Sequence, residues 1–155
     1  MHIVTFSALA DFPNLLEAHL HAFPKPSGGS NDAMDNDPEL IGLVEDALSF
    51  EADVFHANLT AVLETESPVL DMTPRQKEPD PAAEPKALSD LVDTFQTARK
   101  RTLSILQGLT DAQWARTCKC DGGEMTIMGL VHLLSAHDWD QLARLQRRLG
   151  ACSAL

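Results

Sequence analysis

Imidazole and carboxylate side chains gather in one leucine-rich stretch near the carboxyl end of the chain, HLLSAHDWDQ, residues 132–141. Neutral imidazole and carboxylate groups are the usual nitrogen and oxygen ligands of divalent metal ions in proteins. His137 and Gln141 are one helical turn apart, so in a helix their side chains point to one place. The stretch therefore indicates either a metal site or a helix that carries ordinary polar residues.

The helix expected around this stretch has an apolar face, which these polar residues share. The face consists of Ile127, Leu130, Val131, Leu134, Leu145 and Leu149. Gln141 falls near its centre, with His137 and Asp138 on its two flanks. Because a buried polar atom without a partner costs about 1–3 kcal/mol, the three side chains need hydrogen bonds or an ion. Asp138 is expected either to support a metal ligand from behind or to pair with Arg99.

Two carboxylates of the preceding acidic region could face this group. On the helix predicted over residues 38–64, Glu51 and Asn58 lie at the centre of the apolar stripe. Asp46 lies more than ~100° around the helix axis from that centre, near the solvent edge. Glu51 is therefore the better inward carboxylate. Arg99 lies on the apolar stripe of the next helix, so a buried Glu51–Arg99 ion pair without chemistry is the alternative to a metal role.

Prolines and glycines divide the chain into the elements that must position these residues. Helices are predicted over about residues 11–23 (with a start that can lie a few residues earlier), 38–64, 86–107 and 127–150, with Asp37, Thr110 and Thr126 as caps. The segments 24–38 and 67–85 are expected to be long loops, and CKCDGG a short one. The pattern predicts an all-α fold with one domain over residues 1–155. This is a four-helix bundle, up-down-down-up, with a long crossover between the second and third helices.

Composition excludes several classes of protein. The formal net charge of −11 argues against binding to nucleic acid or to an anionic membrane, since both need a basic face. Neither a long uncharged apolar run nor an export signal is present, so we expect a cytoplasmic protein. The charge is uneven: sixteen acids and three bases precede Lys86, and seven acids and nine bases follow from there. Either the acidic half packs on the basic half, or it forms a solvated acidic surface.

Two further features carry weaker signals. His132, Ala136, Trp139 and Ala143 form a second stripe on the back of the last helix, which predicts a homodimer contact unless the long loops cover it. Cys118 and Cys120 could chelate a metal or react as thiols, with Cys152 in the tail. However, zinc sites usually separate two cysteines by two to four residues, so a structural role is the simpler interpretation.

The segments around these residues resemble a known family. LVEDALSFEADVFHANLTAVLETESPVL, residues 43–70, resembles the second helix of the DinB-like (damage-inducible) four-helix-bundle superfamily, which usually contains HLADxE. Residues 91–149 contain RTL, LTDAQW and HDWDQ, where the family has an Arg followed by TL, LTDADW and HDxxH. The resemblance covers about residues 38–149 and implies the same bundle.

The resemblance also implies a metal site. Members of the superfamily typically hold nickel or zinc through one side chain of the second helix and both histidines of HDxxH. The matching positions here are His137 and Gln141, together with either Asp46, at the leading His of HLADxE, or Glu51, at its Glu. Because an amide is a weaker ligand than an imidazole, two interpretations remain: a nickel or zinc site of reduced affinity, or a hydrogen-bonded remnant of one.

Two functions follow from these interpretations. The first is a metal-dependent thiol transferase or hydrolase that acts on a small molecule or thiol, in which the ion activates the thiol or a water. The second is a non-catalytic structural or ligand-binding dimer whose metal site has been lost.

Overall fold

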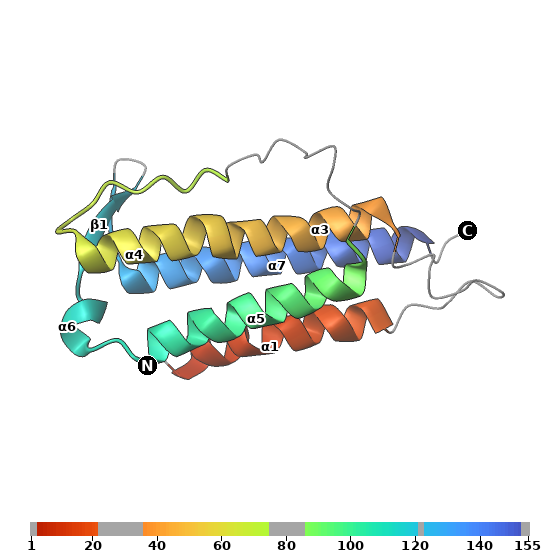
Figure 1. The fold of residues 1–155 in the computed structure, drawn as a ribbon, viewed down its shortest axis with the longest axis horizontal. Coiled ribbons are helices and arrows are strands. Elements are labelled where there is room, and N and C mark those ends of the chain that lie inside the picture. Colours follow the sequence, from red (N-terminus) through yellow and green to blue (C-terminus); the bar gives the residue numbers. More distant parts are fainter. Residues whose placement is uncertain (1–2, 22–35, 75–85, 121–122, 153–155) are drawn as a thin grey trace.

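The computed structural model describes residues 3–21, 36–74, 86–120 and 123–152. In these residues, long helical rods lie side by side, with a small hairpin at one end (Figure 1). The helices are α1 (Ile3–His21), α3 (Pro38–Ser49), the π-helix η1 (Phe50–Phe55), α4 (His56–Glu64), α5 (Leu88–Gln107), α6 (Asp111–Trp114) and α7 (Ile127–Cys152), and the strands are β1 (Thr117–Cys120) and β2 (Gly123–Thr126). α3, η1 and α4 follow one another without a break and form a single rod.

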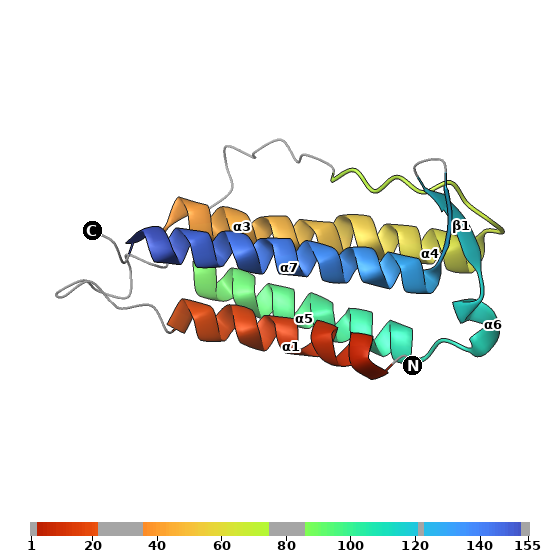
Figure 2. The same ribbon diagram turned by 180° about the vertical axis from the view of Figure 1, so that it is seen from behind.

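The four rods have the predicted up-down-down-up order. α1 and α7 run in one direction, whereas the α3–η1–α4 rod and α5 run in the other (Figures 1 and 2). α1 packs against α5 and α7, and α3 packs against the same two helices. Two successive rods that run in the same direction require a connection along the length of the bundle. Residues 65–74 form its first part (Figure 1), and residues 75–85 of the predicted loop lie outside the described residues. The predicted all-α four-helix bundle is therefore confirmed.

Local signals set several helix ends as expected. The side chain of Asp37 accepts hydrogen bonds from the backbone N–H groups of Glu39 and Leu40, at 2.9 and 3.2 Å, and Pro38 is the first helical residue of α3. Thr110 and Gln113 form a capping box at the start of α6. α1 begins well before residue 11, and α7 continues two residues beyond the end predicted at Gly150.

Pro13 lies inside α1, and the helix continues through it. Since proline has no N–H, the carbonyl of Leu9, four residues earlier, loses its helical donor. Arg99 of α5 donates to that carbonyl through Nη1, at 2.9 Å. A side chain of a neighbouring rod thus satisfies the backbone group that the proline leaves without a partner.

The segment CKCDGG was predicted to be a loop, and this prediction was wrong. Residues 117–120 and 123–126 pair as an antiparallel hairpin, with Cys118 opposite Met125. Thr126 is the last residue of β2, and α7 begins directly after it. The crossover adds one bridge on the other side of β1, where Val69 lies parallel to Lys119. Cys118 and Cys120 are buried, and Lys119 between them is exposed. Burial of every second residue is the pattern typical of a strand.

A layer of buried polar residues separates two apolar clusters in the bundle. One cluster, toward the hairpin, includes Phe55, Leu106 and Leu134; the other, toward the opposite end, includes Phe95 and Leu145. On α5 and α7, the buried polar residues stand between the members of the two clusters. The layer consists of Arg99, Thr102, Asp138 and Gln141, with Glu51 of the second rod beside Arg99. The predicted inward positions of Glu51, Arg99, Asp138 and Gln141 are confirmed.

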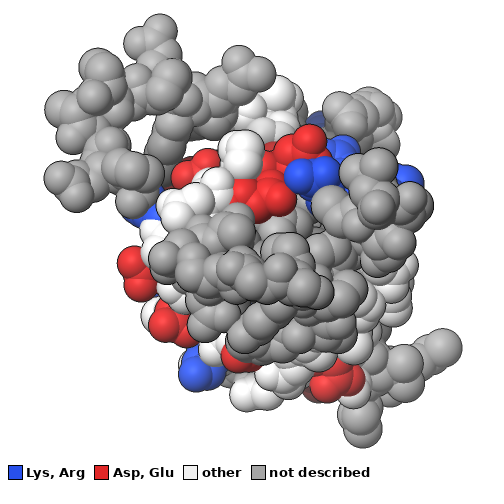
Figure 3. Space-filling model, turned by 90° about the vertical axis from the view of Figure 1, so that its right-hand side faces the viewer, with Lys and Arg blue, Asp and Glu red and all other residues white. Residues whose placement is uncertain are grey.

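The acidic and basic halves of the chain contact each other. Arg148 of α7 forms ion pairs with Asp37, at 3.1 Å, and with Glu39, at 2.6 Å, at the start of α3. Figure 3, which shows the end of the bundle where α3 begins, has acidic and basic side chains next to one another. Of the two interpretations of the charge asymmetry, these pairs favour packing of the halves on each other. No helix in the described parts of the chain is long and apolar enough to cross a membrane.

Candidate functional site

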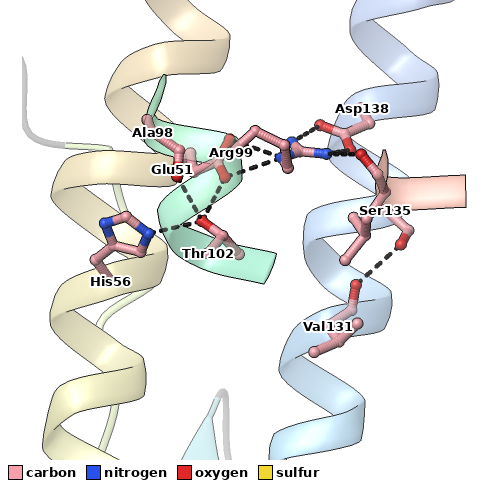
Figure 4. A network of polar contacts seen from close by, with 9 residues as sticks. Glu51, His56, Ala98, Arg99, Thr102, Val131, Ser135 and Asp138 are labelled. Carbon is pink, nitrogen blue, oxygen red and sulfur yellow. Dashed lines mark hydrogen bonds and ion pairs between the residues drawn. The ribbon is translucent and has the colours of Figure 1, made fainter. Parts of the chain in front are cut away.

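Arg99 is the centre of a buried ion network that joins three rods (Figure 4). Its Nε donates to both carboxylate oxygens of Glu51, at 2.9 and 3.0 Å. Nη1 and Nη2 donate to the two carboxylate oxygens of Asp138, at 2.8 and 2.9 Å. The Arg99 side chain is 2% exposed and that of Glu51 0%, so the pair lies in the core. The predicted Glu51–Arg99 ion pair is confirmed, and Asp138 takes the second of its two expected roles by pairing with Arg99.

The network continues through Thr102 to His56 (Figure 4). The Thr102 hydroxyl donates to Glu51 Oε1. Because that hydroxyl has a single proton, His56 Nε2, which lies 2.7 Å from Thr102 Oγ1, donates in turn to the threonine oxygen. Burial lowers the pKa of His56, although the Glu51 carboxylate opposes the change. Sequence reasoning missed His56; the signal that was present is Thr102, a hydroxyl on an apolar stripe that needs a partner.

Two carboxylates and one guanidinium leave the network with excess negative charge. Burial raises the pKa of Asp138 to about 6, against the opposing effect of its hydrogen bonds and ion pair with Arg99. Burial by itself would lower the pKa of Arg99. The hydrogen bonds and negative charges of Asp138 and Glu51 have a larger, opposite effect, so the pKa of Arg99 is raised. Arg99 is therefore charged at every physiological pH, and the network is fully hydrogen-bonded. These features suit a structural core element.

A second polar group lies between α3 and α7 and contains three of the four predicted metal ligands. Gln141 Nε2 lies 2.7 Å from Asp46 Oδ2 and 3.3 Å from His137 Nε2. Gln141 is buried, and Asp46 and His137 are partly buried. The structure thus brings Asp46, His137 and Gln141 together and places Glu51 in the ion network. Asp46, predicted to lie near the solvent edge, is the carboxylate that reaches the site, and its side chain is 43% exposed.

The orientation of His137 is well defined. The ring of Phe50 stacks on the imidazole, with ring centroids 4.0 Å apart and an angle of 7° between the planes. Burial lowers the pKa of His137, although Asp46 and Asp140 raise it in part. The imidazole is therefore neutral at pH 7, which is the form that binds metals. Because Nε2 accepts a hydrogen bond from Gln141, the proton of the neutral ring is on Nδ1.

The chemistry of these side chains fits a divalent ion, although the amide is a weaker ligand than the imidazole and the carboxylate. Asp46 offers carboxylate oxygen, His137 imidazole nitrogen, and Gln141 an amide oxygen, Oε1, that is buried without a hydrogen-bond partner. Rotation of an amide exchanges its oxygen and nitrogen at little cost in shape, so three donors are available at one point. Residues 3–21, 36–74, 86–120 and 123–152 contain no group of three His, Cys, Asp or Glu side chains that could hold a metal. A metal held here therefore depends on the amide.

Arg144 lies at the edge of this group. Its Nε is 2.8 Å from Asp140 Oδ2, and its Nη1 is 3.8 Å from Asp46 Oδ2. The side chain is 50% exposed, so water screens its charge in part. A guanidinium beside a candidate ligand carboxylate competes with a cation for that carboxylate.

The remaining predicted residues lie away from both groups. Cys118 and Cys120 are buried and are not joined by a disulfide, and burial raises the pKa of Cys118, which keeps its thiol protonated and unreactive at neutral pH. The side chain of Cys152 lies outside the described residues. On the back of α7, His132 is exposed and Trp139 is 60% exposed. Trp139 borders a shallow hollow between α1 and α7, lined also by Phe12 and Leu142.

The sequence model of a family described as the DinB superfamily matches residues 50–144. Among solved structures, YfiT from Bacillus subtilis, described as a probable metal-dependent hydrolase with an unusual four-helix bundle topology, superimposes with a TM-score of 0.63 at 16% identity, covering 94% of this chain and 86% of that chain. At this identity the likeness concerns the fold. No curated protein gave a significant sequence match.

Proposed function

Since the chain belongs to the DinB superfamily, we propose that Asp46, His137 and Gln141 form its metal site, and that the protein acts through a divalent ion held there. The observation that carries this proposal is the convergence of the three side chains: Gln141 Nε2 lies 2.7 Å from Asp46 Oδ2 and 3.3 Å from His137 Nε2. Asp46 and His137 also stand at two positions where the family resemblance expects ligands.

The three side chains would have distinct tasks. His137, neutral because burial lowers its pKa, would bind through Nε2, Asp46 would supply the negative charge that offsets the cation, and Gln141 would supply its amide oxygen. A bound zinc or nickel ion would lower the pKa of a coordinated water or thiol and so supply the nucleophile. Three protein ligands leave positions for that group.

We propose hydrolysis or thiol transfer on a small molecule as the reaction class. Hydrolysis is favoured by the fold shared with YfiT, itself described as a probable metal-dependent hydrolase. The exposed side of the site is at Asp46, which is 43% exposed, so a substrate would approach from the α3 edge. A cytoplasmic location remains our expectation from the sequence.

A specific observation favours a second candidate function. The amide of Gln141 donates toward both Asp46 and His137, which satisfies these two ligands without a metal. The same geometry therefore suits a non-catalytic protein whose metal site has become a hydrogen-bonded group. In that case the predicted homodimer, formed through the face around Trp139, would be the functional unit, and light scattering at micromolar concentration would show a dimer that Trp139→Glu dissociates.

Metal retention distinguishes the two candidates. Untagged protein is dialysed against zinc or nickel, then against metal-free buffer, and its metal content is measured by mass spectrometry. We expect about one ion per chain for the natural sequence and less than about a tenth of an ion for His137→Ala. His132→Ala is the matched control, because His132 is an exposed histidine on the same helix. Retention below about a tenth by the natural sequence would reject the metal site and support the non-catalytic candidate.

A further inference from the structure

Phe50 is the one aromatic side chain found stacked on His137 in the described part of the chain. The two rings are nearly parallel, at 7°, with centroids 4.0 Å apart. Phe50 is 8% exposed and is the first residue of η1. Stacking of this kind restricts rotation of the imidazole, because any change in the ring plane would bring its edge against the phenyl face.

We propose that Phe50 is a positioning residue, which holds the imidazole of His137 so that Nε2 faces Gln141 and Asp46. This inference rests on the proposed function as far as metal binding is concerned, although the position of the imidazole can be measured without a metal. The nitrogen on the other side of the ring, Nδ1, is buried without a hydrogen-bond partner. His137 Nδ1 therefore lacks the acceptor to which a metal-binding histidine usually donates a hydrogen bond from its second ring nitrogen. The stack with Phe50 takes the place of that hydrogen bond.

The π-helix explains how Phe50 reaches this position. In η1 the backbone N–H of His56 donates to the carbonyl of Glu51, five residues earlier, so the rod widens at this point. Single π turns of this kind occur frequently at functional sites. Consecutive residues of the widened turn have different tasks: Phe50 contacts His137, and Glu51 binds Arg99.

The ion network keeps the two rods in register for the stack. Arg99 binds Glu51, next to Phe50, and also Asp138, next to His137. By binding both carboxylates, the guanidinium of Arg99 fixes the position of Phe50 on one rod relative to His137 on the other. The network sets where the two rings meet, and the stack sets the plane of the imidazole.

The test compares Phe50→Leu with Phe55→Leu. Phe55 is a matched control because it belongs to the same π-helix, is fully buried and lies in the same apolar cluster, but its ring neighbour is His56. The metal-free proteins are examined by nitrogen–proton NMR of the histidine rings, with the His137 signals assigned from His137→Ala. Zinc affinity is then measured by titration calorimetry. Phe50→Met, which keeps most of the side-chain volume, replaces Phe50→Leu if the latter does not fold.

We expect Phe50→Leu to abolish the ring-current shift of His137, to mix its two neutral tautomers and to weaken zinc binding by about tenfold. Phe55→Leu should leave all three properties unchanged. An unaltered tautomer of His137 and unaltered zinc affinity in Phe50→Leu, or equal changes in both variants, would overturn the inference and make Phe50 an ordinary core residue. If the natural sequence binds no zinc, the proposed function fails, whereas the NMR comparison still decides whether Phe50 positions the imidazole.

Discussion

Replacement of Arg99 by methionine should destabilise the protein strongly. The change keeps an apolar stem of similar length but removes every hydrogen bond that the guanidinium makes to Glu51, Asp138 and the Leu9 carbonyl. Glu51 is 0% exposed and Asp138 4%, so both carboxylates would remain buried without a counterion. Loss of one partner from a buried ion pair costs about 3–5 kcal/mol, which is a large part of the stability of a typical domain.

Urea unfolding followed by circular dichroism at pH 7 measures this loss. For a chain of this length each kcal/mol corresponds to about 2–4 °C in the melting temperature, so Arg99→Met should melt roughly 6–20 °C lower. Arg101→Met is the control, because Arg101 is exposed on the same helix and its replacement should change the free energy of unfolding by about 0.5 kcal/mol or less.

The loss should also depend on pH in a defined direction. The folded pKa of Asp138 is raised from 3.8 to about 6, so between these values the folded protein binds a proton that the unfolded chain does not. Protonation of Asp138 removes a buried charge, and without Arg99 nothing opposes it. The difference between Arg99→Met and the natural sequence should therefore be smaller at pH 5 than at pH 7. A loss below about 1 kcal/mol at pH 7, or a loss that is equal at the two pH values, would refute the account of the network.

Three further predictions concern single side chains. Arg144→Gln should strengthen zinc binding by roughly two- to fivefold at low salt, because a half-exposed positive charge 3.8 Å from Asp46 competes with the ion; calorimetry that shows equal or weaker binding would contradict this. Asp37→Ala should lower the free energy of unfolding by about 1 kcal/mol, since the carboxylate caps α3, and an unchanged urea midpoint would argue against the cap. His137→Gln should lose less stability than the natural sequence as the pH falls below 6.5, because the folded pKa of His137 is lowered and its protonation favours the unfolded chain; parallel urea titrations at pH 7.5 and 5.5 that show no difference would reject it.

Periodicity and punctuation in the sequence were enough to predict the bundle. Proline and glycine positions defined the helices, and the apolar stripes predicted that Glu51, Arg99, Asp138 and Gln141 point inward, as they do. The Glu51–Arg99 ion pair was predicted as one of two alternatives, because opposite charges on inward faces must meet a partner. The hairpin was missed, although Asp121 and Gly122 form a dipeptide typical of two-residue hairpin turns.

Three features depended on how the rods lie against one another. Asp46 rather than Glu51 reaches Gln141, Phe50 stacks on His137, and Arg99 replaces the donor that Pro13 removes from α1. A helical wheel gives the direction of each side chain around its own axis, assuming a regular helix. It gives neither the axial offset between two helices nor the extra width of a π turn. The sequence by itself therefore determined which residues are buried, and only the tertiary structure decided which of them meet, since contacts between rods depend on offsets that packing alone sets.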